Sequence, residues 1–253
     1  MKFVAGRPAM VLGKYLVLAE LHLGIEYELR KKGVRMPLLE NKIAEEINEL
    51  LKETKTHSLI VLGDAKHDIY GMREKEKRMM HRFFSQLHCK RIILVKGNHD
   101  GDLDELAGKY GKKEVKVVPA EGFVLKVGGK TYGLVHGHAW PKKEVFESDF
   151  LLMAHNHPLV EFSSKGYKRA EQVWVIGRMK ESNEFGTRKA QQAVVFPSFN
   201  PLSGGKPVNR SGEGLGPILK NRLMNLDDAE AFLLNGVNLG RIKRLRKFAF
   251  SEE

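Results

Sequence analysis

The chain has 253 residues, of which 42% are hydrophobic and 29% are charged, as is usual for a globular protein with an apolar core. The formal net charge of +12 favours anionic partners such as nucleic acids, phosphorylated substrates or anionic lipids, although a merely charged surface would give the same number. No apolar run is long enough to span a membrane, the N-terminus lacks a signal-peptide pattern, and the single cysteine, Cys89, excludes an internal disulfide framework, so we expect a cytoplasmic protein.

Short apolar runs rich in Val, Ile and Leu recur along the chain, and each predicts a buried strand. These runs are 14–20, 58–63, 91–97, 122–129, 131–137, 149–156, 172–177, 191–197 and 229–236. Between the first three runs, the apolar residues of 38–52 and of 72–87 recur at helical spacing on one face, so both segments predict helices.

The order of these elements indicates the architecture. Strand and helix alternate in the first half, which predicts parallel strands joined by right-handed crossovers. The second half is mostly β and predicts a second, partly antiparallel sheet, with a loop over 163–170. We expect one α/β domain in which two mixed β-sheets pack together and helices cover their outer faces.

Polar side chains follow five of the predicted strands at the point where each strand ends. Seven of the ten histidines lie there, with carboxylates and one amide: Glu20 and His22; Asp64 and His67; Asn98, His99 and Asp100; His136 and His138; His155 and His157. A single histidine in such a place is more often a hydrogen-bonded core residue, but five strand ends in succession argue for a shared site. Because ligands of α/β sheets bind outside the carboxyl ends of the strands, we expect these side chains to converge.

Imidazole, carboxylate and amide groups without cysteine form a ligand set for Mn²⁺, Fe²⁺, Co²⁺, Zn²⁺ or Ni²⁺. One tetrahedral site needs three or four ligands, whereas at least seven candidates converge here, so we expect two cations. A carboxylate such as Asp64 could bridge two cations about 3.5–4 Å apart. Such a pair polarises a phosphoryl group and holds a hydroxide for in-line attack.

The motifs resemble, in their order, the signature of the calcineurin-like metallophosphoesterase superfamily: "ELH" (20–22), "GDAKH" (63–67), "GNHD" (97–100), "HGH" (136–138) and "AHNH" (154–157). The forms "LHLGIE", "GDAKH", "AHNHP" and "FPSFNPLSGGKPVN" resemble a subgroup of mostly archaeal phosphoesterases, related to SbcD-type repair nucleases and to ligase-associated DNA-damage-response endonucleases. The resemblance implies a four-layer α/β sandwich, two mixed sheets flanked by helices, formed by residues 1–253 as a single domain.

The resemblance also implies a role for each motif residue. One metal ion would be held by Glu20, His22, Asp64 and His157, and the other by Asp64, Asn98, His136 and His155. His99 would protonate the leaving oxygen or stabilise the developing charge, and Asp100 would orient it.

Four further residues are expected around the metal ligands. Lys66 and His67 would lie near the phosphate, and His138 would lie behind the ligands or face the substrate. Glu26 could orient a ligand histidine from outside.

Two positions depart from the family pattern. Ala154 begins a motif that starts with glycine in the family, which is a small change. Glu20 stands where the family has aspartate, so its carboxylate reaches one methylene further from the same Cα. Our hypothesis is that Glu20 still binds a cation, but in a weaker site, so that Glu20→Asp would tighten metal binding or raise turnover.

The resemblance implies a metal-dependent hydrolase of phosphoester bonds. The basic charge and the subgroup favour a phosphodiesterase over a monoesterase, with DNA or RNA as candidate substrates and no membrane partner. Two divalent ions are the implied cofactors, Mn²⁺ first, with Ni²⁺, Co²⁺, Fe²⁺ and Zn²⁺ as alternatives. A different class, suggested by Glu20, is a metal-dependent nucleic-acid-binding or regulatory protein with a degenerate, weakly active site. A purely structural metal site is disfavoured by the surplus of ligands and by the spare acid, His99.

Overall fold

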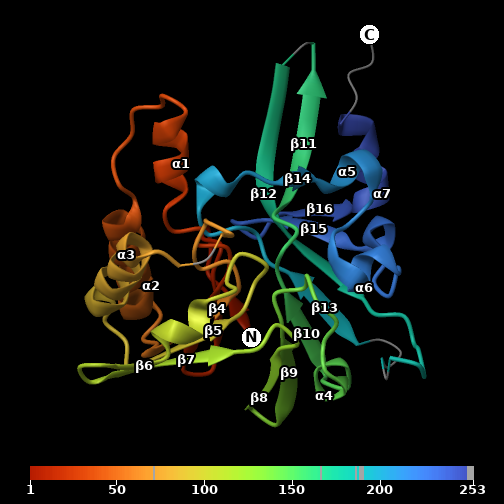
Figure 1. Ribbon diagram of the computed structural model, residues 1–253. Helices are drawn as coiled ribbons and strands as arrows, with labels where there is room; N and C mark the ends of the chain where they lie inside the picture. Colours follow the sequence, from red (N-terminus) through yellow and green to blue (C-terminus); the bar gives the residue numbers. More distant parts are fainter. Residues whose placement is uncertain (71, 166, 186, 188–190, 250–253) are drawn as a thin grey trace.

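The computed structural model describes residues 1–70, 72–165, 167–185, 187 and 191–249, and within them two mixed β-sheets pack between helices (Figure 1). The first sheet has the spatial order β1-β2-β3-β4-β5-β7-β6. Its strands are β1 (Lys2–Phe3), β2 (Met10–Leu12), β3 (Tyr15–Leu18), β4 (Ser58–Leu62), β5 (Arg91–Val95), β6 (Gly108–Tyr110) and β7 (Lys113–Val118). The central strands β3, β4, β5 and β7 run parallel, whereas the pairings at both edges are antiparallel.

The second sheet has the order β14-β11-β12-β13-β10-β9-β8, and β12 also pairs with β15, which pairs with β16. Its strands are β8 (Phe123–Val127), β9 (Lys130–Leu134), β10 (Phe150–Met153), β11 (Pro158–Ser164), β12 (Tyr167–Arg178), β13 (Gln192–Val195), β14 (Lys206–Pro207), β15 (Glu230–Leu233) and β16 (Asn238–Arg241). Strands β9, β10 and β13 are parallel neighbours. The hairpin of β11 and β12 extends beyond the rest of the sheet (Figure 1).

Helices form the two outer layers. The first sheet is covered by α2 (Glu40–Glu53) and α3 (Glu74–Gln86), which lie side by side, and α1 (Ile25–Lys31) stands above them (Figure 1). The second sheet is covered by four short helices, α4 (Lys143–Phe146), α5 (Val208–Ser211), α6 (Gly216–Lys220) and α7 (Ile242–Leu245). Short 3₁₀ turns lie at Leu103–Leu106, Pro201–Ser203, Leu226–Asp228 and Arg246–Phe248. None of the described helices is both long and apolar enough to cross a membrane.

The apolar strands separate three layers of core. In β3, Leu16 and Leu18 face the helices, whereas Val17 faces the second sheet, because successive side chains of a strand point to opposite sides. Both faces of the central strands are therefore buried, which explains why they read as continuous apolar runs. The middle layer contains side chains of both sheets. On that ground we propose that the chain folds as one domain.

The predicted fold class is confirmed, with helices on both outer faces of two mixed sheets. Each of the nine apolar runs overlaps a strand, and the segments 38–52 and 72–87 correspond to α2 and α3. The loop expected over 163–170 is wrong, because Ser164 pairs with Tyr167 at the tip of the β11–β12 hairpin. This tip lies outside the core, so its strands carry no apolar alternation for the sequence to reveal. Residue 166 lies outside the described residues.

Candidate metal centre

The candidate ligands lie in loops that directly follow strands of both sheets. Glu20 and His22 follow β3, Asp64 follows β4, Asn98 follows β5, His136 follows β9, and His155 and His157 follow β10. Because β3, β4 and β5 are parallel neighbours, and β9 and β10 are parallel too, each set of loops leaves its sheet at one edge. The structure brings all seven of these side chains together.

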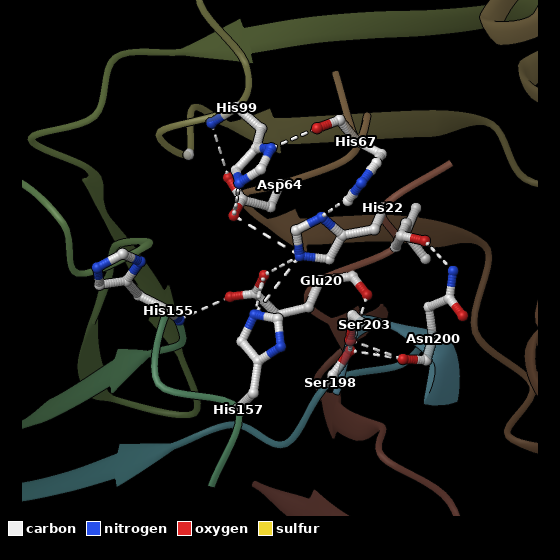
Figure 2. A network of polar contacts seen from close by, with 12 residues as sticks. Glu20, His22, Asp64, His67, His99, His155, His157, Ser198, Asn200 and Ser203 are labelled. Atoms are coloured by element: carbon white, nitrogen blue, oxygen red, sulfur yellow. Dashed lines mark hydrogen bonds and ion pairs between the residues drawn. The ribbon is translucent and has the colours of Figure 1, made fainter. Parts of the chain in front are cut away.

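One group of ligand atoms centres on Glu20 (Figure 2). Its Oε2 lies 2.7 Å from Nε2 of His157 and 3.0 Å from Nε2 of His22. Asp64 Oδ2 lies 3.7 Å from the same His22 nitrogen. One ligand atom from each of these four residues lies within 4.8 Å of all the others, so a single cation could contact them all.

A second group centres on His136, which is fully buried. Its Nε2 lies 3.1 Å from Oδ1 of Asn98, 3.2 Å from Nδ1 of His155 and 3.5 Å from Oδ2 of Asp64. Asp64 Oδ2 therefore faces both groups, which is the position of a bridging carboxylate.

The donor atoms of the second group fit a divalent cation. The carbonyl of Leu62 accepts the Nδ1–H of His136 at 2.9 Å, so whenever the ring is neutral its Nε2 carries a lone pair. That lone pair faces Oδ1 of Asn98, which is another acceptor. Two acceptors this close need a cation or a proton between them. Atoms bound about 2.0–2.2 Å from one ion lie about 3.0–3.5 Å apart.

Backbone strain is concentrated at the same residues. Eight described non-glycine residues have positive φ, and five of them are candidate ligands: Glu20 (60°), His22 (41°), Asp64 (51°), His155 (67°) and His157 (39°). This conformation is unusual for L-residues and costs on the order of 1–3 kcal/mol at each position. Such strain persists only where the surrounding structure imposes it, and it is characteristic of functional sites.

Two motif glycines make room for the ligands. A Cβ atom on Gly63 would lie 2.3 Å from Nδ1 of His136, and one on Gly97 would lie 2.0 Å from Oδ1 of Asp64. The glycines of "GDAKH" and "GNHD" are therefore required by close packing against candidate ligands.

The charged groups of the centre shift one another's pKa values. Burial alone would raise the pKa of the Glu20 carboxyl, but His136, His157 and His22 hold it well below its usual range. Burial raises the pKa of Asp64, and the negative charge of Glu20 adds to this effect. A divalent cation would relieve the repulsion between the two carboxylates.

The histidines of the centre also differ from one another in pKa. Burial, reinforced by His136, lowers the pKa of His155 to about 3 and that of His138 to about 4, so both rings are neutral at physiological pH. Burial acts in the same direction on His157, but its bond to Glu20 raises its pKa above the ordinary value. Neutral imidazole is the form that binds metal ions.

His99 lies beside the centre, with Nε2 3.8 Å from Oδ2 of Asp64. We expected Asp100 to orient its ring, and this expectation is corrected by the contacts. Asp100 is fully buried and accepts the backbone N–H groups of Ala65 and Gly97, at 3.1 and 2.9 Å. The Nδ1–H of His99 donates instead to the carbonyl of His67. Asp100 thus holds the two ligand loops together.

Glu26 does not contact a ligand histidine as expected, because it is buried and accepts the backbone N–H of Leu39 at 3.1 Å. Glu28, which the sequence reasoning missed, takes that place: its Oε2 accepts Nε2–H of His67 at 2.8 Å. Nδ1 of His67 then lies 3.4 Å from Nδ1 of His22, whose Nε2 faces Glu20. This chain of contacts supports the orientation of His22 from outside.

The other two predicted residues are Lys66 and His138. Lys66 is 1% exposed and its ammonium donates to the carbonyl of Asp68, so it braces its own loop and is not free to reach a phosphate. The ring of His138 lies 5.1 Å from that of His136, and its buried Nδ1 has no hydrogen-bond partner among the described residues.

The loop after β13 supports Glu20 from behind (Figure 2). Ser198 Oγ donates to the carbonyl of Glu20 at 3.1 Å, and the side-chain amide of Asn200 donates to the carbonyl of Leu21 at 2.9 Å. The sequence reasoning gave these residues no role, although their segment, "FPSFNPLSGG", was part of the resemblance.

Comparison with known proteins identifies a family and a fold. The sequence profile of the calcineurin-like phosphoesterase family matches residues 14–206. The nuclease MPE of Pseudomonas putida is 18% identical over 89% of this chain and 88% of its own, with a TM-score of 0.52, which shows a shared fold. An archaeal phosphodiesterase is 13% identical over 73% of this chain and 83% of its own, with a TM-score of 0.35. None of the curated proteins matches the chain significantly in sequence.

Proposed function

The chain belongs to the calcineurin-like phosphoesterase family, and from this premise we propose that it is a phosphodiesterase that works with two divalent cations. Membership of this family supports the proposal that the chain hydrolyses phosphoesters. The observation that carries the two-cation proposal is the position of Asp64, whose Oδ2 faces His22 at 3.7 Å and His136 at 3.5 Å.

The donor atoms divide between the two cations. Glu20, His22, Asp64 and His157 would hold one, and Asp64, Asn98, His136 and His155 the other. When bound, two such cations polarise a phosphoryl group and lower the pKa of the attacking water. Because the donors are nitrogen and oxygen only, we propose Mn²⁺, with Ni²⁺, Co²⁺, Fe²⁺ and Zn²⁺ as alternatives.

His99 would act on the substrate. Its Nδ1–H is held by the carbonyl of His67, so Nε2 would be the atom that gives a proton to a leaving oxygen, from the ring protonated at both nitrogens. This nitrogen lies 3.8 Å from Asp64, so it would face a phosphate bound over the metal centre. Asp100 would act indirectly, by holding the loop that presents His99.

Nucleic acid is the diester that we propose as substrate. The net charge of +12 favours a polyanion, and the shared fold of the Pseudomonas putida nuclease is compatible with such a substrate. The single cysteine supports a reducing, cytoplasmic compartment for this activity.

The alternative function, a nucleic-acid-binding or regulatory protein with a degenerate site, was suggested by Glu20 in place of the family's aspartate. In the structure Glu20 still presents an oxygen 2.7 Å from His157 and 3.0 Å from His22, as a metal ligand would. This geometry favours the enzyme.

The test is the hydrolysis of bis-p-nitrophenyl phosphate and of p-nitrophenyl phosphate, first in EDTA and then with each candidate metal. We expect metal-dependent cleavage of the diester in preference to the monoester. His99→Ala should reduce it strongly, whereas His88→Ala, at an exposed histidine of the same chain, should not. Background rates with every metal, together with salt-sensitive DNA binding, would favour the degenerate binding protein instead.

A further inference from the structure

A cavity of about 960 Å³ opens directly beside the metal centre. Its wall is formed by α1, by residues 67–70 and by the start of α3, and it includes His67 and His99. These two histidines contact His22 and Asp64, respectively, so the cavity continues from the point where the phosphate would react.

An exposed apolar pair stands on the wall of this cavity. Tyr70 is 87% exposed and Ile69 is 56% exposed, although both lie in the loop that continues from the "GDAKH" motif. Tyr70 is the most exposed of the large apolar side chains among the described residues. Apolar groups left open beside a reaction centre indicate a binding surface.

This loop is anchored on both sides of the pair. On one side, Lys66 donates to the carbonyl of Asp68, whose Oδ1 accepts the backbone N–H of Tyr70 at 3.0 Å. On the other side, Asp102 accepts the backbone N–H of Met72 at 3.1 Å. The backbone N–H of Tyr70 is therefore held by Asp68, while its side chain is exposed to solvent.

The charges of the wall favour an anion. Its three carboxylates are Glu28, which pairs with Lys32 and His67, Asp68, which accepts the N–H of Tyr70, and Glu76, which accepts the N–H of Arg73. Four cations outnumber these carboxylates by one and take part in none of the ion pairs between described residues: Arg30, Lys31, Arg73 and Lys75. Of these, Arg30 also donates to the carbonyl of Met36. One of them, Lys75, lies 4.1 Å above the ring of Tyr27, so a cation and an aromatic ring lie together in the wall.

We propose that this cavity binds the nucleoside on the leaving-group side of the cleaved phosphate, with its base stacked on Tyr70 and the next phosphate beside the cations. The inference rests on the proposed phosphodiesterase function, and it places the leaving group on this side because His99 lines the cavity. A base can stack on Tyr70 only when it is unpaired, so the substrate is single-stranded nucleic acid or an unpaired end.

The test compares dithymidine monophosphate with its two analogues in which one or the other thymine is replaced by hydrogen. In the parent protein, loss of one particular base should lower kcat/KM about tenfold, since a stacked base contributes about 1–3 kcal/mol. In Tyr70→Ser the ratio between the intact substrate and that analogue should fall from about ten toward one. Tyr167→Ser, at an equally exposed tyrosine on β12, should keep the parental ratio.

Either of two results would overturn the inference alone: equal rates on all three substrates in the parent, or an unchanged ratio in Tyr70→Ser. Both leave the proposed function standing if bis-p-nitrophenyl phosphate is still cleaved with metal. Absence of metal-dependent cleavage on every diester would overturn the proposed function, and the inference with it.

Discussion

The two candidate cation positions share Asp64 but differ in everything else. The first combines two carboxylates with two imidazoles, whereas the second adds only neutral donors, Asn98, His136 and His155, to the shared carboxylate. Affinity for divalent cations rises with the number of charged ligands. The first position should therefore hold its cation tightly and the second should exchange it more easily.

The two positions are also supported differently. The first is supported by side chains from outside the motifs, since His22 contacts His67 and His67 contacts Glu28. The second is supported by the backbone, since the carbonyl of Leu62 holds His136. Side-chain substitutions away from the ligands should therefore affect the first position selectively.

The largest effect is expected from the shared residue. Asp64→Asn removes the charge that serves both cations, and the loss of metal-ion stabilisation is worth several kcal/mol, or about 1,000-fold in rate. Diester hydrolysis with Mn²⁺ measures it, and Asp104→Asn, at an exposed aspartate, serves as the control. An Asp64→Asn protein with nearly parental turnover would remove the bridging role.

Removing one histidine from each position should separate them. Calorimetric titration of the metal-free parent with Mn²⁺ should show two equivalents, one tight and one weak. His157→Ala should lose the tight equivalent, whereas His155→Ala should lose the weak one, because the His157 ring contacts Glu20 and the His155 ring contacts His136. The comparison would fail if both variants lost the same equivalent.

The outer contact of the first position predicts a smaller effect. Glu28→Ala should lower the affinity of the tight equivalent about tenfold, as is usual when a residue that orients a ligand histidine is lost. Glu28→Gln keeps an acceptor for His67 and should recover most of the affinity. Equal losses in both variants would show that charge, and not orientation, is what Glu28 supplies.

Protonation should distinguish the two positions in the metal-free protein. His155, with a pKa of about 3 against an ordinary 6.5, favours the folded state above pH 6.5, and this contribution is lost as pH falls toward 3. His157 has a raised pKa, so its contribution is present below pH 6.5 and is lost as pH rises past its folded pKa. NMR of the histidine ring resonances as a function of pH would measure the pKa values of His155 and His157. Titration of both rings near pH 6.5 would contradict the lowered pKa of His155 and the raised pKa of His157.

The smallest effect concerns Glu20. Its Oε1 accepts the backbone N–H of His155 at 2.6 Å, and its Oε2 lies 2.7 Å from Nε2 of His157. These contacts argue against our expectation that Glu20→Asp tightens metal binding. We now expect about fivefold weaker binding, the equivalent of one hydrogen bond. Tighter binding by the aspartate variant would restore the first expectation.

The sequence predicted the positions of those candidate ligands that directly follow buried strands. Apolar runs mark β3, β4, β5, β9 and β10, so the residues that follow them could be placed at one edge. The role of Glu28 could not be predicted, because it depends on which face of α1 is turned toward His67. Side chains two residues apart on a helix point about 200° apart. Because the Glu28 side chain points to His67, the Glu26 side chain points away from it and contacts the backbone N–H of Leu39.

The contacts of Asp100 could not be read from its motif either. "GNHD" places the carboxylate beside His99 in sequence, yet the chain turns so that it accepts backbone N–H groups of Ala65 and Gly97. Such contacts depend on how two loops meet, which one-dimensional spacing does not contain.

A Mn²⁺ titration of the metal-free protein, with bound metal and hydrolysis of bis-p-nitrophenyl phosphate measured on the same samples, would test directly whether two cations are needed. We expect little activity at one equivalent and a rise in rate as the second, weaker equivalent binds. Full activity at one equivalent would contradict the two-cation centre, and no Mn²⁺-dependent hydrolysis at saturation would contradict the phosphodiesterase itself.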